Sequence, residues 1–132
     1  MNNPLLSVII PAYNGEAFLA EAVESIHRQN YEPLEIIIVD DGSTDDTARI
    51  AAGFQDDVRY IHQTHHGRPA AGRNRGVKES AGKIIGFLDQ DDLWPANKLA
   101  LQIPHLLGES SLGVILGHTQ MLHLSDQVDG KR

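Results

Sequence analysis

The chain has 132 residues, of which 41% are hydrophobic and 22% are charged, and its formal net charge is −7. This length suits one domain with one core, and the acidic balance excludes a general nucleic-acid-binding protein. The absence of cysteine excludes disulfides and thiolate metal sites. The first residues do not resemble a signal peptide and no apolar run could span a bilayer, so we expect a cytoplasmic domain.

Apolar runs alternate along the chain with segments of helical spacing, and this alternation predicts strands that alternate with helices. Pro69 and Pro95 suit first helical turns, whereas Gly82 and Gly108 suit helix ends. Pro11 is expected to end the first strand. The predicted strands are 7–10, 34–39, 58–62, 84–88 and 112–116, with a last segment at 120–124 that could pair with a neighbour. The predicted helices are 16 to about 29, one that Ser43 or Thr44 caps and that Asp45 and Asp46 favour, one over most of the interval 69–82, and 95–108.

Strands that alternate with helices imply a parallel sheet covered by helices on both faces. Ligands bind such sheets at the carboxyl ends of the strands. Two acidic clusters, Asp40-Asp41 and Asp89-Gln90-Asp91-Asp92, each follow a predicted strand. Both clusters should therefore meet at one edge of the sheet, and this convergence is stronger evidence for a site than either cluster alone.

The cluster at 89–92 places three carboxylates directly after the apolar run 84–88. Like charges crowded at the end of a buried strand raise the free energy of the folded state unless a cation or hydrogen-bond donors offset them. Oxygen-only ligands favour Mg²⁺ or Mn²⁺, and such a cation would bridge to phosphate oxygens and stabilise a leaving diphosphate. The alternative is a capping turn before Pro95.

The first two strand ends carry further candidates. Tyr13 follows the first strand and offers a flat face for a nucleobase, although it could equally pack beside the first helix. Asp40 or Asp41 ends the second strand and can accept a hydrogen bond from a base N–H or from ribose hydroxyls. The alternative for this pair is a helix-capping turn.

Basic residues follow the third predicted strand. Arg68, Arg73 and Arg75 would suit a diphosphate that needs neutralising on more than one side, whereas the alternative is a solvated basic helix face. Arg73 and Arg75 point to different sides of a helix, so we expect at most one of them to be a ligand. His65 and His66 are adjacent, a spacing that rarely chelates one ion, and we expect both to be exposed in a loop.

Two other functions also use acidic residues at strand ends. A phospho-receiver domain would carry an acidic pair after the first strand and a lysine after the last. Here residues 11–14 read Pro-Ala-Tyr-Asn, and 112–117 contain no lysine. A nucleotidyltransferase would usually show a glycine-rich basic loop after the first strand, which is missing.

Four segments together resemble family 2 glycosyltransferases over residues 7 to about 102, in the family's order and spacing. They are SVIIPAYNG (7–15), EIIIVDDGSTD (35–45), GRNRGV (72–77) and GFLDQDDLW (86–94). The resemblance implies a GT-A (Rossmann-like) α/β fold for residues 1–132, with a mostly parallel sheet. It also implies inverting, metal-dependent transfer of a sugar from a nucleotide diphosphate sugar, UDP-type favoured, to an acceptor hydroxyl, with Mn²⁺ or Mg²⁺.

The resemblance also implies roles for individual residues. Tyr13, which lies beside Pro11, would stack on the base, and Asp41 would contact it with Asp40 alongside. Arg68 and Arg73 would lie near the base or the diphosphate. Within the DXD motif, Asp89 would approach the ribose or sugar and also contact the metal, and Gln90 would belong to the donor site. Asp91 would be the main metal ligand, with Asp92 close by.

In this family the catalytic base and most of the acceptor site lie in the second half of the domain, and we expect them beyond Arg132. Residues 1–132 are accordingly expected to be a truncated, donor-binding portion that transfers poorly alone. The resemblance leaves the acceptor open among a polysaccharide, a lipid carrier and a protein glycan. It further implies polysaccharide biosynthesis and peripheral association with the inner membrane face.

Overall fold

The computed structural model describes residues 3–108 and 113, and the chain divides into two compact units, Met1–Ala100 and Leu101–Arg132. The strands are β1 (Leu6–Ala12), β2 (Leu34–Asp40), β3 (Val58–His62) and β4 (Ile84–Phe87). The helices are α1 (Leu19–His27), α2 (Thr47–Ala51), α3 (Pro69–Glu79) and α4 (Lys98–Gly108). The strands predicted at 112–116 and 120–124 fall outside the described residues, apart from Gly113.

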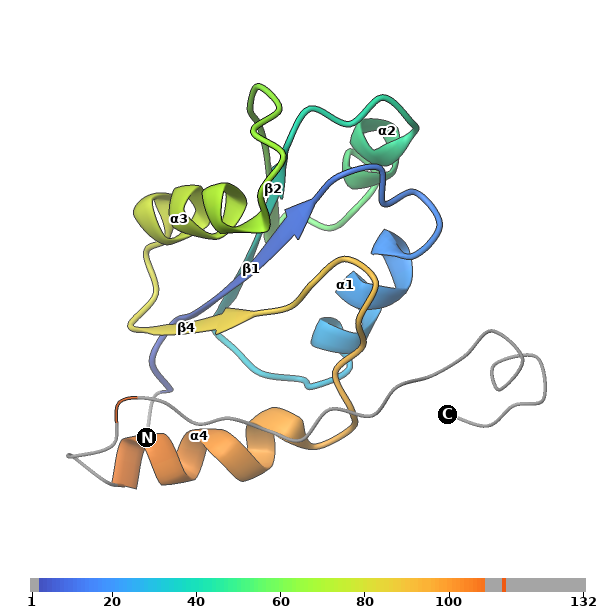
Figure 1. Cartoon of the computed structure of the whole chain (residues 1–132). Helices are drawn as coiled ribbons and strands as arrows, with labels where there is room; N and C mark the ends of the chain where they lie inside the picture. The colour runs from blue at the N-terminus through green and yellow to red at the C-terminus, as the bar shows by residue number, and fades with distance from the viewer. Residues whose placement is uncertain (1–2, 109–112, 114–132) are drawn as a thin grey trace. The chain divides into compact units, whose positions relative to one another are not determined.

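The four strands form one parallel sheet in the order β3-β2-β1-β4 (Figure 1). The chain first steps from β1 to β2 to β3 and then crosses back over the sheet to β4. Because such crossovers are right-handed, α1 and α2 cover one face and α3 covers the other. The prediction of a parallel α/β sheet with helices on both faces is confirmed.

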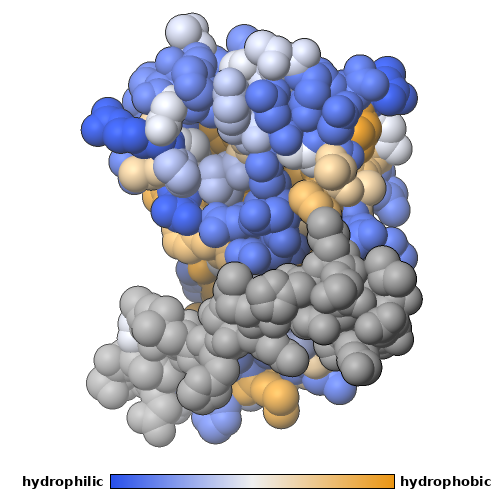
Figure 2. All heavy atoms as spheres, turned by 45° about the vertical axis from the view of Figure 1, so that its right-hand side comes forward, coloured by the Kyte–Doolittle hydropathy of each residue, from blue (hydrophilic) through white to orange (hydrophobic). Residues whose placement is uncertain are grey.

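The core lies on β1 and β2, which both have neighbours on either side and helices on either face. Residues 8–10 and 36–39 are fully buried. Their continuous apolar sequence follows from this double covering, because neither face of these strands contacts water. On the face shown in Figure 2 the described atoms are mainly hydrophilic, and the hydrophobic atoms form separate patches.

Two glycines let α3 lie close to β1. A Cβ at Gly72 would stand 3.0 Å from the Cβ of Pro11, and one at Gly76 would overlap the side chain of Ile9. The glycines are four residues apart and therefore share one face of the helix. Their small size brings the start of α3 to the carboxyl edge of β1, where the acidic clusters also lie. Pro69 is the first residue of α3, as predicted.

Pro11 lies inside β1, so the prediction that it ends the strand is wrong. The carbonyl of Ile9 accepts a hydrogen bond from Leu88 on the β4 side, whereas that of Ala12 accepts one from Asp41 on the β2 side. Odd-numbered residues of β1 therefore face β4, whose pairing with β1 stops at the level of Ile9. The missing N–H of Pro11 faces a position without a strand partner and removes no ladder hydrogen bond.

The helix limits also differ from the predictions. Helices α1 and α4 begin three residues later than expected, at Leu19 and Lys98. Helix α2 begins only at Thr47, so neither Ser43 nor Thr44 caps it, and the hydroxyl of Ser43 instead accepts a hydrogen bond from the N–H of Asn14. A side chain from the segment that precedes α2 thus holds the loop after β1 in place.

Helix α3 ends at Glu79, three residues before the predicted stop at Gly82. Gly82 serves a different purpose, because its N–H donates to the hydroxyl of Ser7 at 2.8 Å and a Cβ there would collide with that hydroxyl. Gly82 therefore marks a position where the backbone comes close to β1, and not the end of a helix.

Candidate functional site

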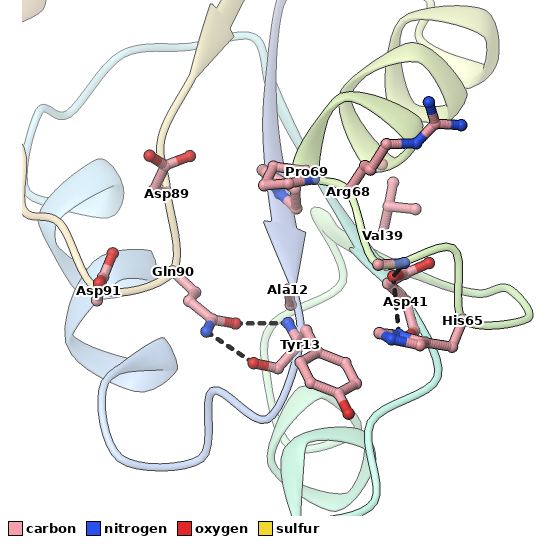
Figure 3. Close-up of a pocket in the computed structure, with 13 residues that line it drawn as sticks. Ala12, Tyr13, Val39, Asp41, His65, Arg68, Pro69, Asp89, Gln90 and Asp91 are labelled. Atoms are coloured by element: carbon pink, nitrogen blue, oxygen red, sulfur yellow. Dashed lines mark hydrogen bonds and ion pairs between the residues drawn. The ribbon is translucent and has the colours of Figure 1, made fainter.

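A cavity of about 510 Å³ opens at the carboxyl ends of β1, β2 and β4 (Figure 3). It lies beside the boundary of β1 with β4, where the strand order reverses direction, which is the usual ligand position in open α/β sheets. The lining residues come from the ends of these strands, the loop after β3 and the start of α3. They are Pro11, Ala12, Tyr13, Val39, Asp41, His65, Gly67, Arg68, Pro69, Gly72, Asp89, Gln90 and Asp91.

The cavity brings together most of the residues that the sequence proposed for one site. Those that line it are Pro11, Tyr13, Asp41, Arg68, Asp89, Gln90 and Asp91. Asp40 and Arg73 do not line it, and the structure gives each of them a partner nearby. The predicted convergence of the two acidic clusters at one sheet edge is therefore present in the fold.

Asp41 is buried, and it organises the loop after β3. Its carboxylate accepts hydrogen bonds from the Gln63 side chain at 3.0 Å, from the His66 N–H at 2.9 and 3.0 Å, and from the Gly67 N–H at 3.0 Å. Burial alone would raise the pKa of this carboxyl, but the hydrogen bonds outweigh it and lower the pKa to about 2. Asp41 is therefore ionised near neutral pH, and its charge holds residues 63–67 at the cavity wall.

His65 lines the cavity, although the sequence analysis gave it no role in the site. The prediction that His65 and His66 are exposed is confirmed. The Nδ1 of His65 lies 2.9 Å from the carbonyl oxygen of Asp41, and its ring centroid lies 4.5 Å from that of Tyr13 at an interplanar angle of 31°. The available signal was positional, because the His65 loop follows β3 at the same sheet edge. Tyr13 itself is 42% exposed, so part of its ring stays accessible to a ligand.

Asp40 is buried on the opposite side of β2 from the cavity-lining Val39. Its carboxylate accepts hydrogen bonds from the Ser43 N–H at 2.8 Å and from the hydroxyl of Tyr60. Burial and this acidic neighbour raise the pKa of Tyr60, which therefore stays protonated as the donor. The observed partners of Asp40 are those of a turn-forming residue.

The carboxylates after β4 have different surroundings. Asp89 accepts a hydrogen bond from Arg73 at 3.0 Å. Among the described residues, none gives Asp91 a hydrogen bond or an ion pair, and its side chain is exposed at the cavity. Partial burial, followed by the charges of Asp91 and Asp89, raises the pKa of Asp92. Arg73 therefore offsets one of the three negative charges in this corner, and the corner keeps a net negative charge.

The side chain of Gln90 extends from this corner to the end of β1. Its Oε1 accepts the N–H of Tyr13 at 2.7 Å, and its Nε2 donates to the carbonyl oxygen of Tyr13 at 2.8 Å (Figure 3). The opposite wall carries Arg68, which has no ion pair with any residue that the structure describes. Negative and positive groups and the ring of Tyr13 thus line the same cavity.

This arrangement supplies three chemical features of a nucleotide site. An accessible aromatic face can stack on a base, an unpaired guanidinium can bind phosphate, and carboxylate oxygens can hold a hard cation. No group of three or more His, Asp or Glu side chains within 3–108 converges on a point that could hold a metal ion. Two carboxylates suit Mg²⁺ or Mn²⁺ only when phosphate and water complete the shell.

Comparison with known proteins agrees with this interpretation. Residues 7–123 match the family described as glycosyl transferase family 2. An uncharacterized glycosyltransferase of Rickettsia conorii is 43% identical over 105 residues, which are 78% of this chain and 17% of that protein. The Escherichia coli protein WfgD, named UDP-Glc:alpha-D-GlcNAc-diphosphoundecaprenol beta-1,3-glucosyltransferase, is 33% identical over 132 residues, which are 99% of this chain and 51% of WfgD. The chain belongs to glycosyl transferase family 2.

Solved structures of glycosyltransferases share the fold. Staphylococcus aureus TarS in complex with UDP-GlcNAc has a TM-score of 0.73 at 26% identity, over 84% of this chain and 37% of that one. The mannosyltransferase PcManGT of Pyrobaculum calidifontis in complex with GDP-Man and Mn²⁺ has a TM-score of 0.74 at 28% identity, over 86% and 35%. The GT-A fold expected from the sequence is thereby confirmed. The family match places the chain with glycosyl transferases and not with phospho-receiver domains or nucleotidyltransferases.

The chain spans only part of its relatives, from 17% of the Rickettsia conorii protein to 51% of WfgD. Among the described residues, no helix has both the length and the apolar character needed to cross a membrane.

Proposed function

We propose that this chain binds a nucleotide diphosphate sugar, UDP-type favoured, and forms the donor site of a metal-dependent, inverting glycosyltransferase. The observation that carries the proposal is that one cavity at the β1–β4 boundary contains an exposed aromatic ring, an unpaired arginine and, after β4, the carboxylates of Asp89 and Asp91. The base of a nucleotide diphosphate matches the ring, its phosphates match the arginine, and the divalent cation that accompanies the phosphates matches the two carboxylates. The bound UDP-GlcNAc of TarS and the bound GDP-Man and Mn²⁺ of PcManGT support this ligand class.

In this proposal the base stacks on the accessible face of Tyr13, beside Pro11. Asp41 orders the loop that carries His65 and Gly67, and in doing so it shapes the base end of the cavity. A direct hydrogen bond from Asp41 to a base would have to replace one of its present donors, because both carboxylate oxygens already accept from the loop. Asp40 contributes through the turn at the end of β2.

The diphosphate end lies between Arg68 and the residues after β4. Arg68 would bind phosphate oxygens, and Arg73 would act through Asp89, which it contacts. Asp91 and Asp89 are the residues that would hold Mn²⁺ or Mg²⁺. When bound, such a cation neutralises charge that develops on a diphosphate leaving group.

The described residues supply no assigned catalytic base, and we place the base and most of the acceptor site outside them. Because the relatives are at least about twice as long as the chain, we propose that residues 1–132 are the donor portion of a longer enzyme. Its acceptor would be a polysaccharide, a lipid carrier or a protein glycan. A role in polysaccharide biosynthesis at the inner face of a membrane fits the name of WfgD, which specifies a diphosphoundecaprenol acceptor.

Isothermal calorimetry tests the proposal directly. UDP, GDP and UMP are titrated into the chain with Mn²⁺ and again with EDTA. We expect UDP to bind with Mn²⁺, and to bind at least about tenfold more weakly in EDTA or when the second phosphate is missing, as in UMP. If none of the three nucleotides binds, either with Mn²⁺ or with EDTA, the proposed function is contradicted.

A further inference from the structure

In the sequence Gln90 lies between Asp89 and Asp91, the two carboxylates proposed to bind the metal, which together form what we call the metal corner. The side chain of Gln90 does not face this corner. Figure 3 shows it reaching across from the β4 exit to the backbone of Tyr13. Its amide accepts the Tyr13 N–H at 2.7 Å and donates to the Tyr13 carbonyl at 2.8 Å. Because the amide oxygen can accept two hydrogen bonds and the NH₂ group can donate two, this pairing occupies half of the hydrogen-bonding capacity of Gln90 and aims both of its polar atoms at Tyr13.

The pairing occurs where the sheet can no longer hold the two chain segments together. The last residue pair between β1 and β4 is Ile9 with Phe87, followed by one hydrogen bond from Leu88 to Ile9. Beyond it the chains have no backbone bonds to each other within the part of the protein that the structure describes. The Gln90 amide takes the place of a strand peptide, and it extends the link between β1 and β4 to the level of Tyr13.

Gly15 shows how closely this link is built. A Cβ at Gly15 would overlap Oε1 of Gln90, and the Gly15 N–H donates to the hydroxyl of Thr47 at 2.9 Å. The turn after β1 is thus fixed on one side by α2 and on the other by Gln90. A larger residue at position 15 would push the Gln90 amide away from Tyr13.

We propose that Gln90 is a positioning residue that sets the place of Tyr13 relative to Asp89 and Asp91. It thereby fixes the distance between the surface on which the base stacks and the corner that takes the metal and the diphosphate. The role rests on the proposed function and deepens it, because only a ligand with both a base and a diphosphate spans the two ends. Ligands that use one end alone do not depend on this distance.

The test compares ligands of different reach. Calorimetry with Mn²⁺ measures the affinity of wild type, Gln90→Ala and the similarly sized Gln90→Met for UDP and for inorganic pyrophosphate. Both variants should bind UDP roughly tenfold more weakly, since two hydrogen bonds that preorganise the site are lost. Their affinity for pyrophosphate should stay within about twofold of wild type, because that ligand uses the metal ligands and Arg68 but does not reach Tyr13. Gly15→Ala should reproduce the same pattern.

Gln29→Ala is the matched control. Its amide also joins a distant backbone, accepting from the Leu99 N–H at 3.0 Å and donating to the Pro95 carbonyl at 2.8 Å, but it does not line the cavity. Gln29→Ala should change thermal stability while UDP affinity stays within about twofold of wild type.

A double-mutant cycle distinguishes positioning of Tyr13 from a general loss of stability, because a general loss of stability would not produce coupling between the two residues. In a Tyr13→Ala background, Gln90→Ala should have little further effect on UDP.

The outcomes separate the two proposals. If wild type binds no nucleotide, the proposed function fails and this inference fails with it. If wild type binds UDP but Gln90→Met binds it equally well, only the positioning role is overturned. Equal losses for UDP and pyrophosphate, or strict additivity with Tyr13→Ala, would likewise overturn it, because Gln90 would then act on the metal corner or independently of the tyrosine.

Discussion

The guanidinium of Arg73 lies 3.0 Å from the carboxylate of Asp89, so that α3 and the exit of β4 are joined beside the cavity. The pair is about half exposed, with side-chain exposures of 40% and 46%, and its contribution to folding should therefore be small. Its consequence is local, because it offsets the charge of Asp89, whereas Asp91 lines the cavity without an ion pair to any residue that the structure describes. Arg68, unlike Arg73, lines the cavity itself.

Replacement of Arg68 by alanine should weaken diphosphate binding. The loss should be roughly tenfold for UDP and much smaller for uridine, since a charge-assisted hydrogen bond to phosphate contributes about 1.5–3 kcal/mol. Calorimetry at low and high salt measures both ligands. Arg49→Ala is the control, because Arg49 pairs with Asp46 on the surface and does not line the cavity. Equal losses for UDP and uridine would show that Arg68 does not act on the diphosphate.

Replacement of Tyr13 by alanine should weaken both UDP and uridine. Stacking of a base on an aromatic ring contributes about 1–3 kcal/mol, so the affinity should fall roughly tenfold or more. Tyr13→Phe should keep near wild-type affinity, because the ring face and not the hydroxyl carries the contact. A phenylalanine variant as weak as the alanine variant would instead assign the contribution to the hydroxyl.

Asp41 predicts a specific pH dependence of stability. Its pKa is about 2 in the folded protein, below its ordinary value of 3.8, so the unfolded chain takes up the proton first as the pH falls. The stabilisation is complete above the ordinary value and is lost as the pH falls from there through about 2. Asp41→Asn should therefore be less stable than wild type at pH 7, and the difference in free energy of unfolding should shrink between about pH 4 and pH 2.

Urea unfolding of wild type and Asp41→Asn at neutral and acidic pH measures this difference. Parallel pH profiles of the two proteins would show that the carboxylate does not anchor residues 63–67.

The packing of α3 on β1 gives a prediction about stability. Gly76→Ala would place a methyl group against Ile9 and should destabilise the fold by about 1–3 kcal/mol despite the better helix propensity of alanine. Gly53→Ala is the control, because its Cβ would meet only the Ile50 carbonyl oxygen, at an ordinary 3.5 Å. Thermal unfolding compares the two, and a Gly76 variant as stable as the control would contradict the close packing.

Much of the fold followed from the sequence because hydrophobic patterns report burial. The runs at 34–39, 58–62 and 84–88 all became strands with limits within one residue of those predicted. The acidic clusters at strand ends also predicted a common sheet edge. These features depend on local periodicity, which can be read from the sequence, and on the right-handedness of crossovers, which is a general rule for such sheets.

Other features depend on contacts between distant residues and could not be predicted. The sequence shows Gly82 and Pro11 as punctuation, but the side-chain hydroxyl of Ser7 and the early end of β4 decide their positions. The pairing of Gln90 with Tyr13 joins residues 77 positions apart. Similarly, the contact of His65 with Tyr13 appears only once β3 and β1 end at the same edge.

The most direct measurement of the central claim is Mn²⁺-dependent UDP binding by Asp91→Ala. Asp91 lines the cavity without an internal partner among the described residues, so its removal should leave folding intact and remove the effect of Mn²⁺ on UDP affinity. Asp56→Ala, which removes an exposed carboxylate away from the cavity, is the matched control. We predict that UDP binds Asp91→Ala equally weakly with Mn²⁺ and with EDTA, while Asp56→Ala behaves as wild type. A full response of Asp91→Ala to Mn²⁺ would contradict the assignment of the metal-diphosphate corner.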